Sequence, residues 1–397
     1  MKQSFPFIDK ILIFTLFLFT ASSMFSISIS QVSAGLGGFF WLLKTHLTDT
    51  WKEQRWPLGI PFTLFVLACL VAVVNAYDVN YSYKSLKKLL EFLIFFWVLN
   101  CVRDNNSRNS LCLVLTASAT LAGLFGLYQN WQDFDLNDGI SSQNRPEGSL
   151  STYMTFAGLL MLAGVIALAR VLFQKPTHKW LLGSIGIITL SLLLTLTRQA
   201  WLGFIVALIF ILFVWRKKII LLVPIMLLVV YIASPPPVQQ RLKGIVIGND
   251  VTFGMRVALW KGGWEIFKDH PLTGCGFRCV DLVNSQYPDP TGYIERYRGM
   301  HNNLIQVAVD TGVLGVTAWL GIWFCFLRCL YHKAITLEKN ADEGWIIFGS
   351  AAAVLAFLAG GFFETNFYDS EVAMLLYFIM ALPFSGTQNT TEATVKI

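Results

Sequence analysis

Apolar runs separated by short polar stretches follow one another along almost the whole chain of 397 residues. Many runs reach about 20 residues, the length that an α-helix needs to cross the hydrocarbon core of a bilayer. The alternating pattern typical of a transmembrane β-barrel is absent. We therefore expect an all-α polytopic membrane protein with about twelve transmembrane helices, the second of them short. The expected segments are 10–29, 31–43, 57–75, 85–102, 110–128, 151–173, 180–196, 199–215, 219–234, 302–330, 344–363 and 371–385.

The composition supports this fold class. Hydrophobic residues make up 55% of the chain and charged residues 14%, against about 25% charged residues in an ordinary soluble domain. The first apolar run ends near Ala21, Ser22 and Ser23, as a secretory signal can. Because apolar character continues beyond them, we expect an uncleaved first helix. The net charge of +6 comes from dispersed basic residues, which argues against nucleic acid as a partner.

The basic residues predict which side of the membrane each loop faces, because cytoplasmic loops are enriched in lysine and arginine. With a cytoplasmic N-terminus, every cytoplasmic loop is basic: these loops and their helix ends contain Lys44, Lys52, Arg55, Arg103, Arg108, Arg170, Lys175, Lys179, Arg216, Lys217, Lys218, Arg328, Lys333 and Lys339. We expect residues 1–234 to hold nine helices and residues 235–301 to form a large, partly helical outward loop. Residues 302–397 then hold three helices and a short cytoplasmic tail.

Some cations lie on the outer side and break this rule, so each needs a partner or a function. They are Arg145 in a polar loop, Arg198 between two long apolar runs, the cluster Lys84, Lys87 and Lys88 at the fourth helix, and Arg241, Arg256, Arg278, Arg296 and Arg298 in the large loop. The histidines divide in the same way: His270 and His301 lie outside, and the other three lie in cytoplasmic loops.

Arg198 is the most costly of these residues, since an arginine at the end of a membrane helix needs a partner, water or a path to the surface. It precedes the apolar run AWLGFIVALIF and is therefore expected at a helix N-terminus. The helix dipole and the free amide groups at such an end favour an anion. The alternative is an arginine that anchors the helix end at the membrane surface.

Arg256 lies near the start of a predicted amphipathic helix, residues 253–269. Its apolar residues Met255, Leu259, Trp260, Trp264 and Phe267 fall close to one face. The two tryptophans indicate a position at the membrane interface. The guanidinium group can then point to the bilayer surface, or it can simply be solvated.

His301 precedes two asparagines and a long apolar run. A helix that begins at Asn302 or Asn303 would be capped by that asparagine, which leaves His301 at the entrance of the helix. A neutral imidazole there can accept a proton from a hydroxyl group. Gln306, on the same early turn, can orient a polar substrate. A purely structural histidine is the alternative reading.

Two further groups on the outer side stay open at this level. Glu364 and its neighbours Asp369 and Glu371 can pair with the arginines, bind sugar hydroxyls or be solvated. Cys275 and Cys279 can form a disulfide if their loop faces an oxidising compartment, or remain thiols.

Two arginines that can hold phosphate and one histidine that can act as a base form a coherent set. Guanidinium groups match phosphate oxygens in pairs, and a diphosphate leaving group needs such stabilisation as its bond breaks. A transferase that uses a lipid-diphosphate donor can therefore work without a metal or other cofactor. The chain contains no HExxH, Walker A or GxGxxG motif that would support soluble nucleotide-donor chemistry.

The motifs around these residues resemble the O-antigen ligases, a family grouped with O-antigen polymerases and O-oligosaccharyltransferases. The resemblance rests on TRQAWLGFIVAL around Arg198, RVALWKGGWEIFKDHPLTGCGF from Arg256 and HNNLIQVAVDTGVLG from His301. It covers mainly residues 190–330. TRQAW departs from the commoner SRGAW form, and Asn303 stands where an apolar residue is usual.

The resemblance implies transfer of a glycan from undecaprenyl diphosphate to a sugar hydroxyl of lipid A–core, at the periplasmic face of the bacterial inner membrane, in lipopolysaccharide biosynthesis. It implies that Arg198 and Arg256 bind the donor diphosphate and that His301 activates the acceptor, in an inverting, metal-independent reaction. As further substrate-binding residues we expect Arg145, Lys88, Asn302, Gln306 and Trp260. Membrane lipids are the other expected partners.

Three alternatives remain. An O-antigen polymerase shares the chemistry but uses a different acceptor. A protein O-oligosaccharyltransferase often has an additional C-terminal region. A transporter of an anionic substrate would more typically show internal repeats with helices broken at mid-membrane.

The charge pattern predicts a labelling result. A cysteine placed at position 145 should react with a membrane-impermeant thiol reagent added from the periplasm, and one placed at position 217 should not. The chain with only its native cysteines is the control. The reverse result would overturn the assignment of sides.

Overall fold

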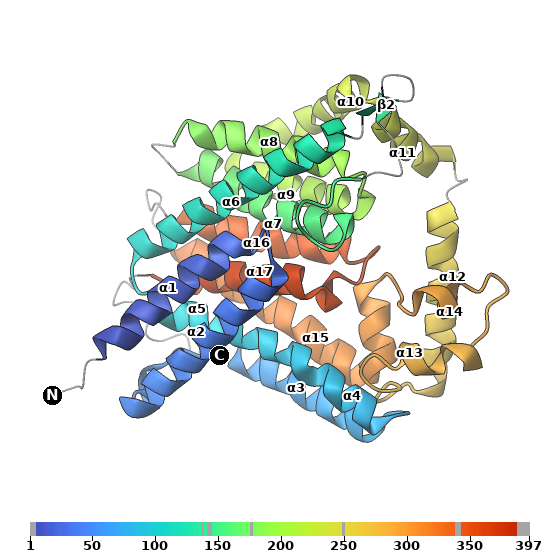
Figure 1. Ribbon diagram of the computed structural model, residues 1–397, viewed down its shortest axis with the longest axis horizontal. Helices are drawn as coiled ribbons and strands as arrows, with labels where there is room; N and C mark the ends of the chain where they lie inside the picture. Colours follow the sequence, from blue (N-terminus) through green and yellow to red (C-terminus); the bar gives the residue numbers. More distant parts are fainter. Residues whose placement is uncertain are drawn as a thin grey trace.

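Helices make up most of the described part of the chain in the computed structural model (Figure 1). The structure describes residues 5–132, 134–135, 139–140, 145–174, 178–247, 251–337 and 343–386. Lys175, Lys339 and the predicted cytoplasmic tail lie outside these residues, except for the start of the tail at residue 386.

In the first part of the chain, the described residues form ten α-helices with short 3₁₀ segments (η) and one small strand pair. In order these are α1 (Pro6–Ser22), α2 (Ile27–Leu47), η1 (Trp51–Glu53), α3 (Gly59–Val74), α4 (Val79–Ser85), η2 (Leu86–Glu91), α5 (Phe92–Cys101), α6 (Asn105–Gln132), the antiparallel strands β1 (Phe134–Asp135) and β2 (Gly139–Ile140), α7 (Tyr153–Phe173), α8 (Trp180–Leu194), α9 (Arg198–Arg216), η3 (Lys217–Leu222) and α10 (Val223–Ala233).

The second part begins with the predicted outward loop, which has helices of its own. The elements are α11 (Pro236–Ile247), α12 (Val251–Asp269), α13 (Val280–Val283), η4 (Asn284–Gln286), α14 (Tyr293–Tyr297), α15 (Asn303–Thr336), α16 (Gly344–Gly360), η5 (Asn366–Tyr368), α17 (Ser370–Ala381) and η6 (Leu382–Phe384). Helices α12 to α14 gather at one side of the main bundle (Figure 1).

Each predicted apolar segment overlaps a helix or consecutive helical pieces, but the first segment, 10–29, is wrong as a single helix, because α1 ends at Ser22 and α2 begins at Ile27. Within the described residues, α6, α7 and α15 are by length and composition able to cross a membrane, and α3, α8, α16 and the stretch Ser370–Phe384 are shorter apolar helices. The count of twelve spans therefore stays a prediction. The expectation of a short second helix is wrong, because α2 has 21 residues. The side chain of Ser26 accepts a hydrogen bond from the Ile29 amide and starts this helix earlier than the apolar pattern indicates.

Helices α7 and α10 show the two environments of a membrane bundle. α7 packs against α6, α8, α9, α16 and α17, and most of its residues are buried. It is apolar on all sides because it has neighbours on all sides. α10 is equally apolar, yet of its residues only Val223 is buried. An exposed apolar surface of this kind is expected to face lipid rather than water.

The outward loop is tied to the bundle mainly through α12, which packs on α15 and on α14. Its buried residues include Met255, Leu259 and Ile266, while Trp264 is 57% exposed. The predicted single apolar face was therefore wrong in part. The five apolar residues do not share one environment, because the helix buries one side against α14 and α15 while Trp264 is exposed; the position at the membrane interface stays a prediction.

A break in α15 gives the loop its second attachment. Gly312 has a φ of 62°, and the chain is non-helical at this residue. Backbone groups on either side of the break bond to the segment that follows α12. The Val313 amide donates to the Pro271 carbonyl at 2.9 Å, and the Cys275 amide donates to the Val309 carbonyl at 3.0 Å. A disulfide between Cys275 and Cys279 links this segment to the residues just after it. Of the two possibilities that the sequence left open, a disulfide or free thiols, the structure therefore has the disulfide.

This attachment predicts the effect of two glycine substitutions. Gly274 (φ +70°) and Gly312 (φ +62°) have left-handed backbones, and a Cβ atom at either position would overlap the backbone of the facing segment. Gly274→Ala and Gly312→Ala should therefore each destabilise the protein by roughly 1–3 kcal/mol. Gly321→Ala is the matched control on α15, because no atom lies within 4 Å of its added Cβ. Thermal unfolding of the purified protein measures the effect, and equal midpoints for all three variants would contradict it.

Candidate functional site

Arg198, Arg256 and His301 come from three helices that meet at one end of the bundle. Arg198 is the first residue of α9, Arg256 lies in the first part of α12, and His301 lies two residues before α15. The loop between α16 and α17, residues 361–369, lies among them. The structure therefore brings the three residues of the sequence motifs to one place.

The two arginines meet at Thr252, in the first turn of α12. The Arg198 Nη2 donates to the Thr252 hydroxyl, and the Arg256 Nη1 donates to the Thr252 carbonyl at 3.3 Å. Arg198 has the predicted position at the start of a helix. The N-cap residue Thr197 makes no capping hydrogen bond, because its hydroxyl donates to the Thr195 carbonyl. The positive end of the α9 dipole therefore adds to the charge of both guanidinium groups.

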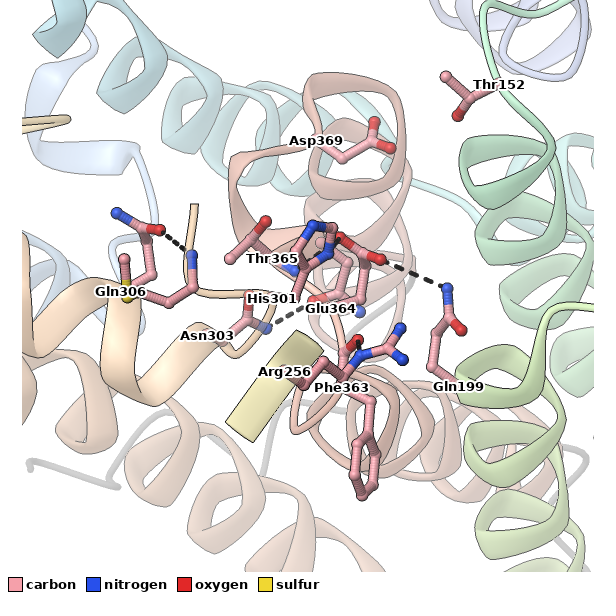
Figure 2. A network of polar contacts seen from close by, with 12 residues as sticks. Thr152, Gln199, Arg256, His301, Asn303, Gln306, Phe363, Glu364, Thr365 and Asp369 are labelled. Atoms are coloured by element: carbon pink, nitrogen blue, oxygen red, sulfur yellow. Dashed lines mark hydrogen bonds and ion pairs between the residues drawn. The ribbon is translucent and has the colours of Figure 1, made fainter. Parts of the chain in front are cut away.

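His301 is paired with a carboxylate. Its Nδ1 lies 3.0 Å from Oε1 of Glu364, and the two side chains are only 16% and 15% exposed. The second carboxylate oxygen, Oε2, accepts a hydrogen bond from the Gln199 side chain at 3.5 Å. Figure 2 shows these three side chains in a row, with Arg256 beside them.

The surroundings of Glu364 favour its ionised form. Burial by itself would raise the pKa of this carboxyl group, but the hydrogen bond and charge of His301, the Thr365 amide and the charge of Arg256 together lower it from its ordinary value. An ionised carboxylate can only accept hydrogen bonds, so the Nδ1 of His301 carries the proton in this pair. The other ring nitrogen, Nε2, is then the atom that can accept a proton.

Four consecutive residues of the loop after α16 hold the site together. The Gly361 carbonyl accepts from the Asn303 amide at 2.7 Å, and the Phe362 carbonyl accepts from the Asn302 side chain at 3.0 Å. The Phe363 carbonyl accepts from the Arg256 Nε at 2.9 Å. Glu364 then reaches His301, so this loop connects His301 to one of the arginines (Figure 2).

The backbone at His301 is held in an unusual conformation, with a φ of +43°. Such a conformation persists in a non-glycine residue only where its surroundings impose it. On one side the Met300 amide donates to Oε1 of Gln306 at 2.9 Å. On the other side the Asn302 side chain caps α15 by accepting from the Ile305 amide at 3.0 Å, as the sequence predicts.

The predicted substrate-binding residues divide into two groups: two buried amides, and three side chains that lie against aromatic rings. Asn302 and Gln306 are buried, with both ends of each amide bonded inside the protein, since the Gln306 Nε2 donates to Asp310 at 3.1 Å. These contacts hold neighbouring parts of the protein in position, and they leave neither amide exposed for a substrate. Trp260 packs against Phe363 at a ring distance of 6.0 Å. Arg145 lies over the ring of Tyr153 at 4.5 Å, and Lys88 lies 5.9 Å from the centre of the Tyr368 ring.

A cavity of about 480 Å³ opens next to His301. Glu364, Gln199 and Lys88 also line it. The rest of its wall includes Ser151, Thr152, Met154, Thr155, Arg278, Thr365, Asn366, Tyr368, Asp369, Ser370 and Glu371. The Asp369 side chain caps α17 and accepts a hydrogen bond from the Thr155 hydroxyl at 2.7 Å. No group of three His, Cys, Asp or Glu side chains suited to a metal ion occurs in the part of the chain that the structure describes.

Sequence reasoning missed the most important partnership of the site. Glu364 was one of three acids whose role stayed open, and Gln199 and Thr252 were not singled out. His301 and Glu364 are 63 residues apart, so no local spacing rule connects them. The available signal was their predicted location on the same side of the membrane. The structure also explains the asparagine at position 303, where an apolar residue is usual: its buried side chain forms hydrogen bonds with the Asn366 side chain and the Phe367 amide.

Comparison with known proteins agrees with the motifs. No curated protein matches the chain. The family model described as O-antigen ligase matches residues 182–320, a range that contains Arg198, Arg256 and His301. It overlaps most of residues 190–330, where the resemblance was seen. Over residues 182–320, this helical membrane protein is therefore similar to the O-antigen ligases.

Proposed function

We propose that the protein transfers an O-antigen glycan from undecaprenyl diphosphate to a sugar hydroxyl of lipid A–core in lipopolysaccharide biosynthesis. The reaction takes place at the periplasmic face of the bacterial inner membrane, with both termini in the cytoplasm. The observation that carries the proposal is the His301–Glu364 pair beside two arginines and an open cavity. The family match to O-antigen ligases supports the class of reaction.

Arg198 and Arg256 form the donor side of the site. Their guanidinium groups come together at Thr252, and the start of α9 adds the positive end of a helix dipole. A diphosphate carries its charge on oxygens that guanidinium groups bind in pairs. These two arginines stabilise the negative charge that collects on the leaving diphosphate, so side chains of the protein itself provide this stabilisation.

His301 forms the acceptor side. The acceptor hydroxyl oxygen attacks the anomeric carbon of the donor sugar while its proton passes to Nε2 of His301. The bond between the anomeric carbon and the phosphate oxygen breaks, and the electron pair leaves with undecaprenyl diphosphate. Glu364 orients the imidazole and stabilises the imidazolium that forms. The products are the new glycosidic bond, the lipid diphosphate and a proton that His301 later releases.

An O-antigen polymerase would use the same donor groups and a second donor molecule as the acceptor. A protein O-oligosaccharyltransferase would use a protein hydroxyl. An anion transporter would need the arginines along a path through the membrane, whereas Arg198 and Arg256 meet at one end of the bundle with a base beside them. The acceptor is therefore the property that separates the leading alternatives.

The proposal predicts loss of transfer in three variants. Arg198→Ala, Arg256→Ala and His301→Ala should each abolish glycan attachment while protein level and membrane insertion persist. Lys261→Ala, which removes an exposed cation from the same helix as Arg256, is the control and should keep activity. The assay is reconstitution with undecaprenyl-diphosphate glycan and two acceptors, lipid A–core and a second donor molecule.

The outcomes of that assay are distinct. Product on lipid A–core supports the ligase, and product on the second donor alone would make the protein a polymerase. Full glycan attachment by His301→Ala would contradict the role of this residue as the base.

Glu364 provides a separate prediction. Glu364→Gln keeps the size of the side chain but removes the charge that supports the imidazolium, so kcat should fall by about 10²-fold or more with little change in KM. Because the pKa of Glu364 is lowered, its ionised form and the stability it contributes are present above its ordinary pKa and are lost as the pH falls through the lower value. The wild-type rate should therefore show no loss from this carboxylate between pH 5 and pH 8.

Initial rates across this pH range measure both effects. Glu295→Gln, at an exposed glutamate in α14, is the matched control and should behave as wild type. A wild-type kcat in Glu364→Gln would show that the pair with His301 plays no part in the reaction.

A further inference from the structure

The cavity beside His301 is larger than activation of one hydroxyl group requires. Its volume of about 480 Å³ lies within the range of about 300–1,000 Å³ that is typical of small-molecule sites. The wall is built from separate parts of the chain, including the start of α7, the start of α9 and the loop before α17. A cavity of this size holds a short piece of oligosaccharide rather than a single water molecule.

Arg256 and the cavity lie on different sides of the His301–Glu364 pair, and the cations that line the cavity among the described residues are Lys88 and Arg278. The lining includes Gln199 and Glu364, but among the described residues it includes neither Arg198 nor Arg256. In Figure 2, Arg256 lies on one side of the pair, and Asp369 and Thr152 lie on the other. In a direct displacement with inversion, the attacking oxygen approaches the face of the sugar opposite the leaving group. With the diphosphate on the arginine side, the acceptor approaches from the cavity.

The wall offers the groups that bind sugar hydroxyls. Asp369 lies opposite Thr152 in the view of Figure 2, and both line the cavity. Hydroxyl groups come from Thr155 and Ser370, and an amide comes from Gln199. Each of these can donate or accept a hydrogen bond, and a carboxylate accepts from a hydroxyl. Lys88, predicted as a substrate-binding residue, lines the same cavity.

We propose that this cavity binds the sugar end of the acceptor through its hydroxyl groups, with Asp369 as a principal contact. The inference rests on the proposed function, because that function places the diphosphate at Arg198 and Arg256. It assigns Asp369 and the start of α7 to the acceptor and separates them from the donor residues.

Two variants test this assignment without removing the catalytic groups. Asp369→Asn replaces one carboxylate oxygen with an amide nitrogen but keeps the cap of α17, because asparagine caps a helix as well as aspartate does. Met154→Trp places a larger ring in the cavity from the first turn of α7, where Met154 is half-buried. Asp269→Asn, at an exposed carboxylate on the outward loop, is the control. Thermal unfolding verifies that all three variants fold.

The full-length protein is assayed with undecaprenyl-diphosphate glycan as donor and lipid A–core as acceptor. Asp369→Asn and Met154→Trp should raise the acceptor KM about 10-fold or more, because the first removes a hydrogen-bond acceptor and the second fills space in the cavity, and leave the donor KM within about twofold. Asp269→Asn should change neither value. A raised donor KM with an unchanged acceptor KM, or two unchanged values, would overturn the assignment.

Direct binding keeps this test separate from the test of the proposed function. The dissociation constant for lipid A–core is measured with no donor present, on the wild-type protein and on both variants. If the wild type transfers no glycan but Asp369→Asn and Met154→Trp both weaken binding about 10-fold, the proposed reaction fails and the cavity assignment stands. If transfer occurs and both variants bind the acceptor as tightly as wild type, the cavity assignment fails and the reaction stands.

Discussion

The break in α15 is the constraint on which the site depends. A backbone group inside a membrane protein must find a partner within the protein, because the bilayer core offers none. At Gly312 the helix leaves such groups without helical partners, and the segment 271–276 supplies them. This segment follows directly from α12, the helix of Arg256. The part of α15 that begins beside His301 is thereby fastened to the helix that holds one of the arginines.

A second set of contacts, made by Asp310, adds to this attachment. Asp310 lies just before the break and is fully buried. One of its carboxylate oxygens accepts from Gln306, the residue that holds the Met300 amide, and the other accepts from the Tyr368 hydroxyl at 2.6 Å. Asp310 thus joins the turn of His301 to the loop of Glu364. The left-handed backbone at His301 is stabilised from both sides by these buried hydrogen bonds.

The features that depend on nearby residues were predictable from the sequence. Apolar runs located the helices, and the boundary position of Arg198 and the asparagine cap before α15 followed from local rules. Features that depend on distant partners were not predictable. The acid that pairs with His301 lies 63 residues away, and the buried side of α12 is set by α14 and α15. The length of α2 was missed for a different reason, because one serine cap outweighed the apolar pattern.

The loop of residues 361–369 contacts both halves of the proposed site. Its Phe363 carbonyl accepts a hydrogen bond from Arg256, a proposed donor-binding residue, and Asp369, at its other end, lines the cavity. Between them lies Glu364, the carboxylate that pairs with His301. In the proposed reaction the two substrates would contact opposite ends of one loop, so a displacement of this loop by either substrate would alter the contacts of the other.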